Sequence, residues 1–126
     1  GTINLIDATV RAINGSEATL DGPGFGQFRA PAIDGLKVGQ KITAAIRPEK
    51  IMLGRERPEG PDNWAVATVR DIAYMGDMSI YLLRLDSGKV VRVTQPNIYR
   101  HAEDRITWEE RVYLQWYPES PVVVTK

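Results

Sequence analysis

Apolar and polar residues alternate in short runs along the whole chain, and no long stretch has the three-four spacing of a helix. The apolar runs are rich in β-branched and aromatic residues, and glycine, proline, asparagine and aspartate separate them. This pattern predicts an all-β protein. The predicted strands are Ile3–Ile13, Ala18–Asp21, Gln27–Ala30, Lys41–Ile46, Ile51–Leu53, Trp64–Tyr74, Ser79–Leu85, Val90–Thr94, Arg111–Tyr117 and Val122–Thr125.

Turn residues stand between these runs. Asn14-Gly15 and Gly76-Asp77 are typical of tight hairpin turns, because these residues tolerate positive φ. The segment GPGFG (residues 22–26) also reads as a hairpin loop, because it lacks the lysine and the following helix of a phosphate-binding loop. The segment 101–108 is open to two interpretations, an irregular loop or one helical turn.

The hexamer ATVRAI (residues 8–13) returns as ATVRDI (residues 67–72). Other elements repeat in the same order: FRAP and VRVTQP, then KITAAIRPE and RVYLQWYPE, then IML and VVV. The offset grows from 59 to 70 residues, so the second copy carries an insertion of 11. We expect a duplicated unit, with residues 3–53 as the first half, 64–126 as the second and the polar segment 54–63 as the linker.

A unit of about five short strands that begins with a hairpin has the size of a small barrel of the oligonucleotide-binding (OB) type. We therefore predict tandem OB-like small barrels, continuous or intertwined. Closure of the strands into barrels also protects their edges from pairing with other chains.

Composition narrows the function. The 126 residues include 16 basic and 16 acidic side chains, and this zero net charge argues against a dedicated nucleic-acid binder. Cysteine is absent, which excludes disulfides and thiolate sites. The apolar runs are too short to span a bilayer. The chain does not begin with methionine, so we expect it to be part of a longer protein.

Few residues carry candidate chemistry. His101 is the single histidine, and we expect it to be a surface residue. Asp71 and Asp77 flank Tyr74 in DIAYMGD, which could bind a cation or a polyamine, but a strand followed by a turn is the favoured interpretation. We expect the aromatic residues to pack in a core or an interface. No catalytic, cofactor-binding or metal-ligating residues are predicted.

Four segments carry a family resemblance: IRPEKIML (residues 46–53), VRDIAYMGDMSIYLLRL (69–85), VVRVTQPN (90–97) and LQWYPESPVVV (114–124). They resemble the C-terminal TOBE region of the ATP-binding subunits of ABC transporters, closest to the spermidine/putrescine importer type. The resemblance covers nearly the whole chain, so residues 1–126 are expected to form one TOBE regulatory region with an OB-like fold.

The resemblance implies a regulatory and dimerisation domain without catalysis of its own. It also implies a preceding ATPase domain that binds ATP and Mg²⁺, a second copy of the subunit, a membrane permease and a substrate-binding protein. The complex would lie on the cytoplasmic face of a bacterial inner membrane. Some TOBE domains bind oxyanions such as molybdate, but this chain resembles the transporter version.

Nine residues match the family pattern, and we expect structural, interfacial or regulatory roles for them: Arg47, Pro48, Glu49, Tyr74, Gly76, Asp77, Trp116, Pro118 and Glu119. Pro48 should interrupt a strand because it has no N–H, and Arg47 and Glu49 are expected to pair across it. Two alternatives stay open: a stand-alone binder of single-stranded nucleic acid and a small-ligand sensor.

Overall fold

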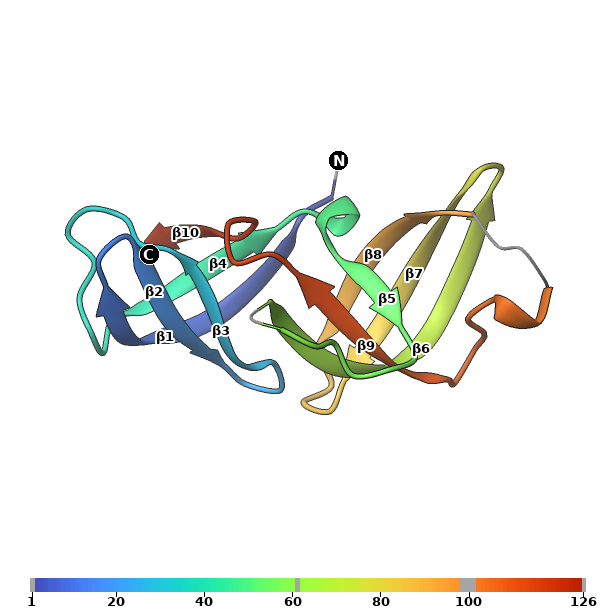
Figure 1. The fold of residues 1–126 in the computed structure, drawn as a ribbon, viewed down its shortest axis with the longest axis horizontal. Coiled ribbons are helices and arrows are strands. Elements are labelled where there is room, and N and C mark those ends of the chain that lie inside the picture. The colour runs from blue at the N-terminus through green and yellow to red at the C-terminus, as the bar shows by residue number, and fades with distance from the viewer. Residues whose placement is uncertain (1, 61, 98–101, 126) are drawn as a thin grey trace.

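The computed structural model describes residues 2–60, 62–97 and 102–125, which form two small barrels side by side (Figure 1). The first sheet contains β1 (Asn4–Asn14), β2 (Glu17–Gly22), β3 (Gly26–Pro31), β4 (Lys41–Ile46) and β10 (Val122–Thr125). The second contains β5 (Met52–Gly54), β6 (Asn63–Met75), β7 (Met78–Leu85), β8 (Val90–Pro96) and β9 (Arg111–Trp116). Two 3-10 turns are also present, η1 (Pro48–Lys50) and η2 (Ala102–Asp104).

The predicted strands are confirmed, with small shifts at their ends. η2 agrees with the one-turn alternative for the segment 101–108, whereas His101 itself lies outside the described residues. Asn63, which the sequence assigns to the linker, is instead buried and begins β6. In the described part of the chain, no helix is long and apolar enough to cross a membrane.

The two halves of the chain exchange their last strands: β5, from the first half, joins the second sheet, and β10, from the second half, joins the first. The first has the order β10-β4-β1-β2-β3 and the second β5-β9-β6-β7-β8, so β10 completes the first sheet and β5 the second. Val122 pairs with Ala45 of β4, and Met52 pairs with Gln115 of β9. Each sheet curls until its outer strands approach each other, β10 beside β3 and β5 beside β8. The predicted fold of intertwined OB-like barrels is therefore confirmed.

The repeated hexamers mark the same irregularity in both barrels. The register between β1 and β2 shifts at Arg11, and the register between β6 and β7 shifts at Arg70. Such a β-bulge bends its strand and increases the local twist, which helps a short sheet to curl into a barrel. The exposed arginine is the extra residue in each case, so the repeat encodes curvature rather than chemistry.

The loops before β4 and β9 also correspond. Val10 exchanges two backbone hydrogen bonds with the first loop, at 2.9 and 2.7 Å, and Val69 exchanges two with the second, at 2.9 and 2.8 Å. Gly39 (φ +88°) and Glu109 (φ +64°) hold the same place in the two loops. Glu109 is the one non-glycine residue with positive φ in the described part of the chain.

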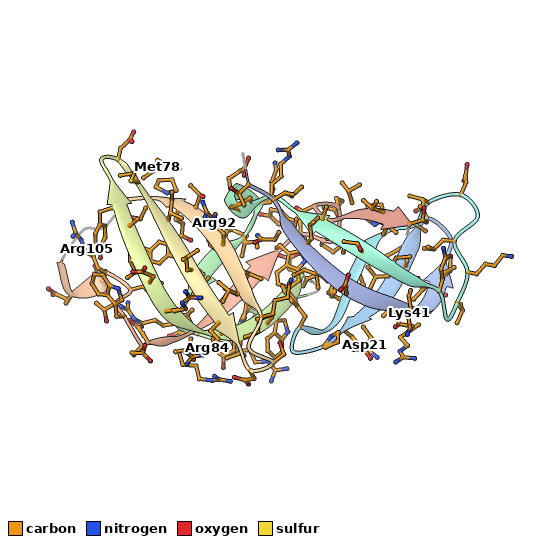
Figure 2. All side chains as sticks on the ribbon, turned by 180° about the vertical axis from the view of Figure 1, so that it is seen from behind. Asp21, Lys41, Met78, Arg84, Arg92 and Arg105 are labelled. Carbon is orange, nitrogen blue, oxygen red and sulfur yellow. The ribbon has the colours of Figure 1, made fainter. Side chains whose placement is uncertain are left out.

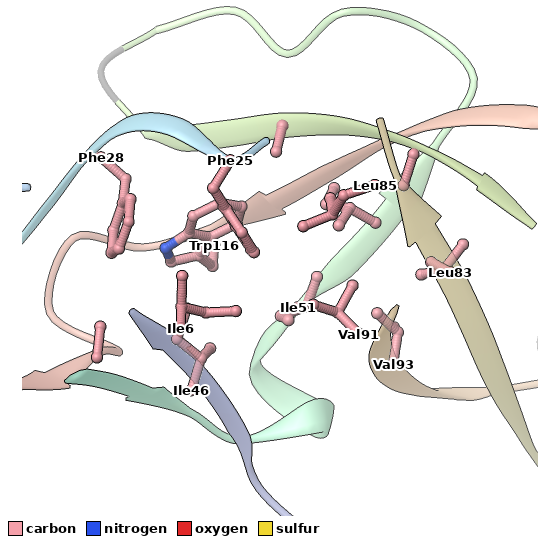
Figure 3. Packing of buried hydrophobic residues seen from close by; sticks show 14 of the residues in the cluster. Ile6, Phe25, Phe28, Ile46, Ile51, Leu83, Leu85, Val91, Val93 and Trp116 are labelled. Atoms are coloured by element: carbon pink, nitrogen blue, oxygen red, sulfur yellow. The ribbon is translucent and has the colours of Figure 1, made fainter. Parts of the chain in front are cut away.

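The buried side chains of both barrels form one continuous hydrophobic cluster. Figure 3 shows Trp116 of β9 against Phe25 and Phe28, which belong to the first barrel. The ring centroids of Trp116 and Phe25 lie 5.0 Å apart at 80°, and those of Trp116 and Phe28 lie 5.9 Å apart at 65°. Because Trp116 is fully buried there, the two barrels share a core rather than only touching.

Candidate functional site

Two buried asparagines connect the barrels. Asn63 of β6 donates its Nδ2 to the carbonyl of Arg29 and accepts the N–H of Arg29 at Oδ1, both at 2.8 Å. Asn4 of β1 makes the same two bonds with the backbone of Arg92, also at 2.8 Å. Sequence reasoning missed both asparagines. The available signal was their separation, which is the same 59 residues that separate the two hexamers.

A cleft lies beside the Asn63 contact, between the β2–β3 hairpin and the start of β6. It encloses about 670 Å³, within the range of small-molecule sites. We call it the junction cleft. Its lining includes Gln27, Phe28, Arg29, Asp62, Asn63, Trp64, Asp86 and Arg111.

Three of the four charged side chains that line the junction cleft are in ion pairs. Arg111 donates two hydrogen bonds to the Asp86 carboxylate, at 3.0 and 2.9 Å. These bonds and the charge of Arg111 hold the pKa of Asp86 below its usual value. The Arg29 guanidinium lies 3.6 Å from Glu17. The lining carries two positive and two negative side chains, and its aromatic members include Trp64.

The two Pro-Glu motifs form equivalent turns. Pro48 is buried and opens η1 directly after β4, as its missing N–H predicts, and the Lys50 N–H bonds the Arg47 carbonyl at 3.0 Å. Pro118 lies in a turn that the Ser120 N–H closes on the Tyr117 carbonyl, also at 3.0 Å. The expected pair between Arg47 and Glu49 is wrong: no ion pair joins these two described residues. Pro48 turns the chain into η1, where positions two apart do not face each other.

Both turns border a second hollow of about 550 Å³, which we call the axial hollow. It is lined by Ile3, Ala45, Arg47, Lys50, Tyr117, Glu119, Ser120 and Val122. The structure thus brings Arg47 and Glu119, which are far apart in the sequence, to one depression on the surface.

Tyr74, Gly76 and Asp77 lie at the outer end of the second barrel, where Gly76 takes φ +68° in the β6–β7 turn. Asn97 fixes this turn: its Nδ2 donates to the Gly76 carbonyl at 2.9 Å and its N–H donates to the Asp77 carbonyl at 2.8 Å. The Ser79 hydroxyl also bonds the Asn97 side chain. The favoured interpretation of this segment as a strand and a turn is confirmed, and Asn97 is the residue that sequence reasoning missed.

The same end carries an ordered aromatic pair. The rings of Tyr74 and Trp108 meet edge to face at 6.3 Å, and the Trp108 indole N–H donates to Asp71 at 3.3 Å. The Arg105 guanidinium lies 5.5 Å from the centre of the Tyr74 ring. Figure 2 shows Arg105 at the outer end of the second barrel. Arg105 thus already supplies the cation that this cluster attracts.

Taken together, the predicted residues fall into three places. Trp116 lies in the shared core, the two Pro-Glu motifs surround the axial hollow, and Tyr74, Gly76 and Asp77 form the outer tip. In the part of the chain that the structure describes, no group of three or more acidic, histidine or cysteine side chains could hold a metal ion. The two hollows are the places where this surface could receive a ligand or a partner.

Comparison with protein families gives a match to the TOBE domain over residues 44–124. The chain is 35% identical to the putrescine transport ATP-binding protein PotG of Escherichia coli over 126 residues, which is 99% of this chain and 33% of PotG. It is 37% identical to the spermidine/putrescine import ATP-binding protein PotA of Chromobacterium violaceum over 98 residues, which is 77% of this chain and 27% of that protein. The chain spans about a third of the length of such relatives.

Among solved structures, the cytoplasmic molybdate-binding protein ModG, with molybdate bound, superposes with a TM-score of 0.87. The match covers 98% of this chain and 96% of ModG at 15% sequence identity. At that identity the likeness shows the fold alone.

Proposed function

This chain belongs to the TOBE domain family, and we propose that it is the regulatory and dimerisation domain of the ATP-binding subunit of a bacterial ABC importer for polyamines. The observation that carries the proposal is the 35% identity to PotG across 99% of this chain. A continuous core, two clefts and balanced charge suit a domain that works by contact.

Under this proposal, ATP hydrolysis takes place in a preceding domain of the same subunit, which binds ATP and Mg²⁺. This chain supplies no catalytic group. Two copies of the subunit would serve a membrane permease fed by a substrate-binding protein, on the inner face of the bacterial inner membrane. The family resemblance and the names of the relatives support these assignments.

The test uses the full-length subunit, its permease and its binding protein in proteoliposomes. We expect ATP-dependent uptake of labelled putrescine or spermidine, and a changed rate or changed control of uptake when residues 3–125 are deleted. A matched surface change, Val38→Ser in an exposed loop of the first barrel, should leave uptake within about twofold. Uptake of another solute class, or none of polyamines, would contradict the assignment.

A small-ligand sensor is the second candidate, and the junction cleft is the observation that favours it. Calorimetry of this chain with spermidine, putrescine, amino acids and phosphate esters tests it. Binding should weaken in Trp64→Ala and persist in Tyr117→Ala, an aromatic substitution outside the cleft. The third candidate, binding of single-stranded nucleic acid, predicts a salt-dependent signal with a labelled oligonucleotide, which the zero net charge disfavours.

A further inference from the structure

Three residues form an apolar row across the outer face of the first sheet. Leu5 of β1 and Val122 of β10 both pair with Ala45 of β4. Leu5 is 51% exposed and Val122 59% exposed, and the small side chain of Ala45 is buried between them. Val124, two positions along β10, points to the same face, and Ile3 and Tyr117 lie at its edge. We call Leu5, Ala45 and Val122 the bare row.

The second barrel contains the equivalent positions in Trp64, Gln115 and Met52, which pair in the same way. There the segment that leads into β6 contacts two of them, Trp64 and Gln115, whereas Met52 is 38% exposed. Arg57 places its guanidinium 4.7 Å from the centre of the Trp64 ring, and Asp62 accepts a hydrogen bond from Gln115 at 3.0 Å. The same sheet face is therefore partly covered by a chain segment in the second barrel, whereas in the first barrel the two outer residues of the row are each more than half exposed.

The bare row continues into other exposed apolar side chains on the same face. Contiguous exposed apolar surface of this kind often marks a contact site. The axial hollow opens beside it, because Ala45 and Val122 line both. Arg47 and Lys50 border that hollow, and neither has an ion-pair partner among the described residues.

These features define the chemistry of a partner. It presents aliphatic side chains to the bare row and a carboxylate to Arg47 and Lys50, placed away from Glu119, which lines the same axial hollow. In the second barrel the cover comes from the chain that enters β6; the corresponding place in the first barrel is the entry to β1, beside Ile3.

We propose that the bare row and the axial hollow are the docking surface for the ATP-binding part of the same subunit. This inference rests on the proposed function, which puts that part immediately before β1 and hence next to this face. The row is bare in this chain because the domain that covers it lies outside the chain.

The test uses the absence of cysteine from this chain. Leu5→Cys and Val122→Cys are made in this chain and in the full-length subunit, and the rate of alkylation by N-ethylmaleimide is measured at each site by peptide mass spectrometry. We expect both sites to react about tenfold more slowly in the full-length subunit, because a covered thiol reacts only when the contact opens. Val38→Cys, at a 64% exposed position in the first barrel, is the matched control and should react at equal rates in both.

A double change, Arg47→Glu with Lys50→Glu, should restore fast labelling at position 5 of the full-length subunit by repelling the partner's carboxylate. Equal rates at positions 5 and 122 in the two proteins would overturn the proposal. So would slow labelling in this chain alone that depends on its concentration, since a second copy would then cover the row. ATP hydrolysis by the same full-length protein tests the proposed function separately.

Discussion

Asn4 and Asn63 make the same pair of hydrogen bonds, each to the backbone of an arginine in the opposite barrel. Each asparagine offers one donor and one acceptor on the same planar amide, which matches the N–H and carbonyl of a single strand residue. The internal repeat relates the two contacts. Each barrel therefore supplies one asparagine that hydrogen-bonds a strand of the other barrel.

Removal of one of these amides should destabilise the whole domain. In Asn63→Ala, the part-buried N–H and carbonyl of Arg29 lose their partners, and we expect the free energy of unfolding to fall by about 1–3 kcal/mol. Urea unfolding monitored by tryptophan fluorescence measures this. Glu59→Ala, at an exposed loop position, should change it by less than about 0.5 kcal/mol. Similar values for the two variants would show that the contact is dispensable.

Gly24 and Gly26, in the β2–β3 hairpin, allow backbone strain to be distinguished from steric overlap of a side chain. Both have nearly the same φ, +76° and +75°, but a Cβ at Gly24 would collide with the Ser87 side chain, whereas one at Gly26 would meet nothing within 4 Å. Gly26→Ala should cost about 1–2 kcal/mol for backbone strain alone. Gly24→Ala should cost clearly more, and Ser87→Gly should recover part of the difference. Thermal or urea unfolding of the three variants decides, and equal costs at both glycines would rule out the close approach.

Glu109 adopts a backbone conformation that favours glycine. Its φ of +64° strains a side chain with a Cβ, and its counterpart in the first barrel is Gly39. Glu109→Gly should therefore stabilise the domain by about 0.5–1 kcal/mol, the strain relieved less the added freedom of the unfolded chain. The reverse change, Gly39→Glu, should destabilise it. Loss of stability in Glu109→Gly would mean that the Glu109 side chain contributes more than its conformation costs.

Acid should weaken the contact between Glu110 and Arg55. Burial acts to raise the pKa of Glu110, but the hydrogen bonds from Arg55 and from the Thr107 N–H, together with the Arg55 charge, outweigh it and lower the pKa below its ordinary 4.5. A carboxyl with a lowered pKa stabilises the fold at higher pH, and this stabilisation is lost as the pH falls below about 4.5 through the folded-state pKa. Glu110→Gln and Arg55→Gln should both flatten this acid loss in urea titrations between pH 6 and 3, and an unchanged slope would contradict the assignment.

Trp116 should tolerate loss of its nitrogen but not of its ring. Its indole N–H has no hydrogen-bond partner among the described residues, so Trp116→Phe removes volume without breaking a bond. We expect Trp116→Phe to cost about 1–2 kcal/mol and Trp116→Ala about 3–5 kcal/mol, because only the second opens a large cavity between the barrels. Calorimetric unfolding compares them. Equal costs would indicate an unseen polar partner for the indole.

The strands and turns could be predicted from the sequence because they depend on local properties. The alternation of apolar residues and the glycines at positive φ act over a few positions, and both are visible in the printed chain. Even the exchange of strands was foreseeable as an option, because two barrels of such short strands have open edges to share.

The contacts across the junction could not be predicted in the same way. Asn63 hydrogen-bonds the backbone of Arg29, 34 positions away. Because every residue has the same backbone groups, the sequence contains no signal that identifies this partner. Asn97 likewise bonds carbonyls of the β6–β7 turn. The expected pair of Arg47 and Glu49 failed because Pro48 begins a helical turn, a detail that depends on how the chain leaves β4.

The exchange of β5 and β10 also sets an order of events during synthesis. As the chain leaves the ribosome, β1 to β4 emerge first, yet β4 pairs with β10, which ends at Thr125. Until those last residues appear, β4 keeps one unpaired edge, the kind of edge that pairs with other chains. The second sheet can form earlier, because all of its strands, β5 to β9, have been synthesised once Trp116 is added. The sheet that is synthesised first is the one that is finished last.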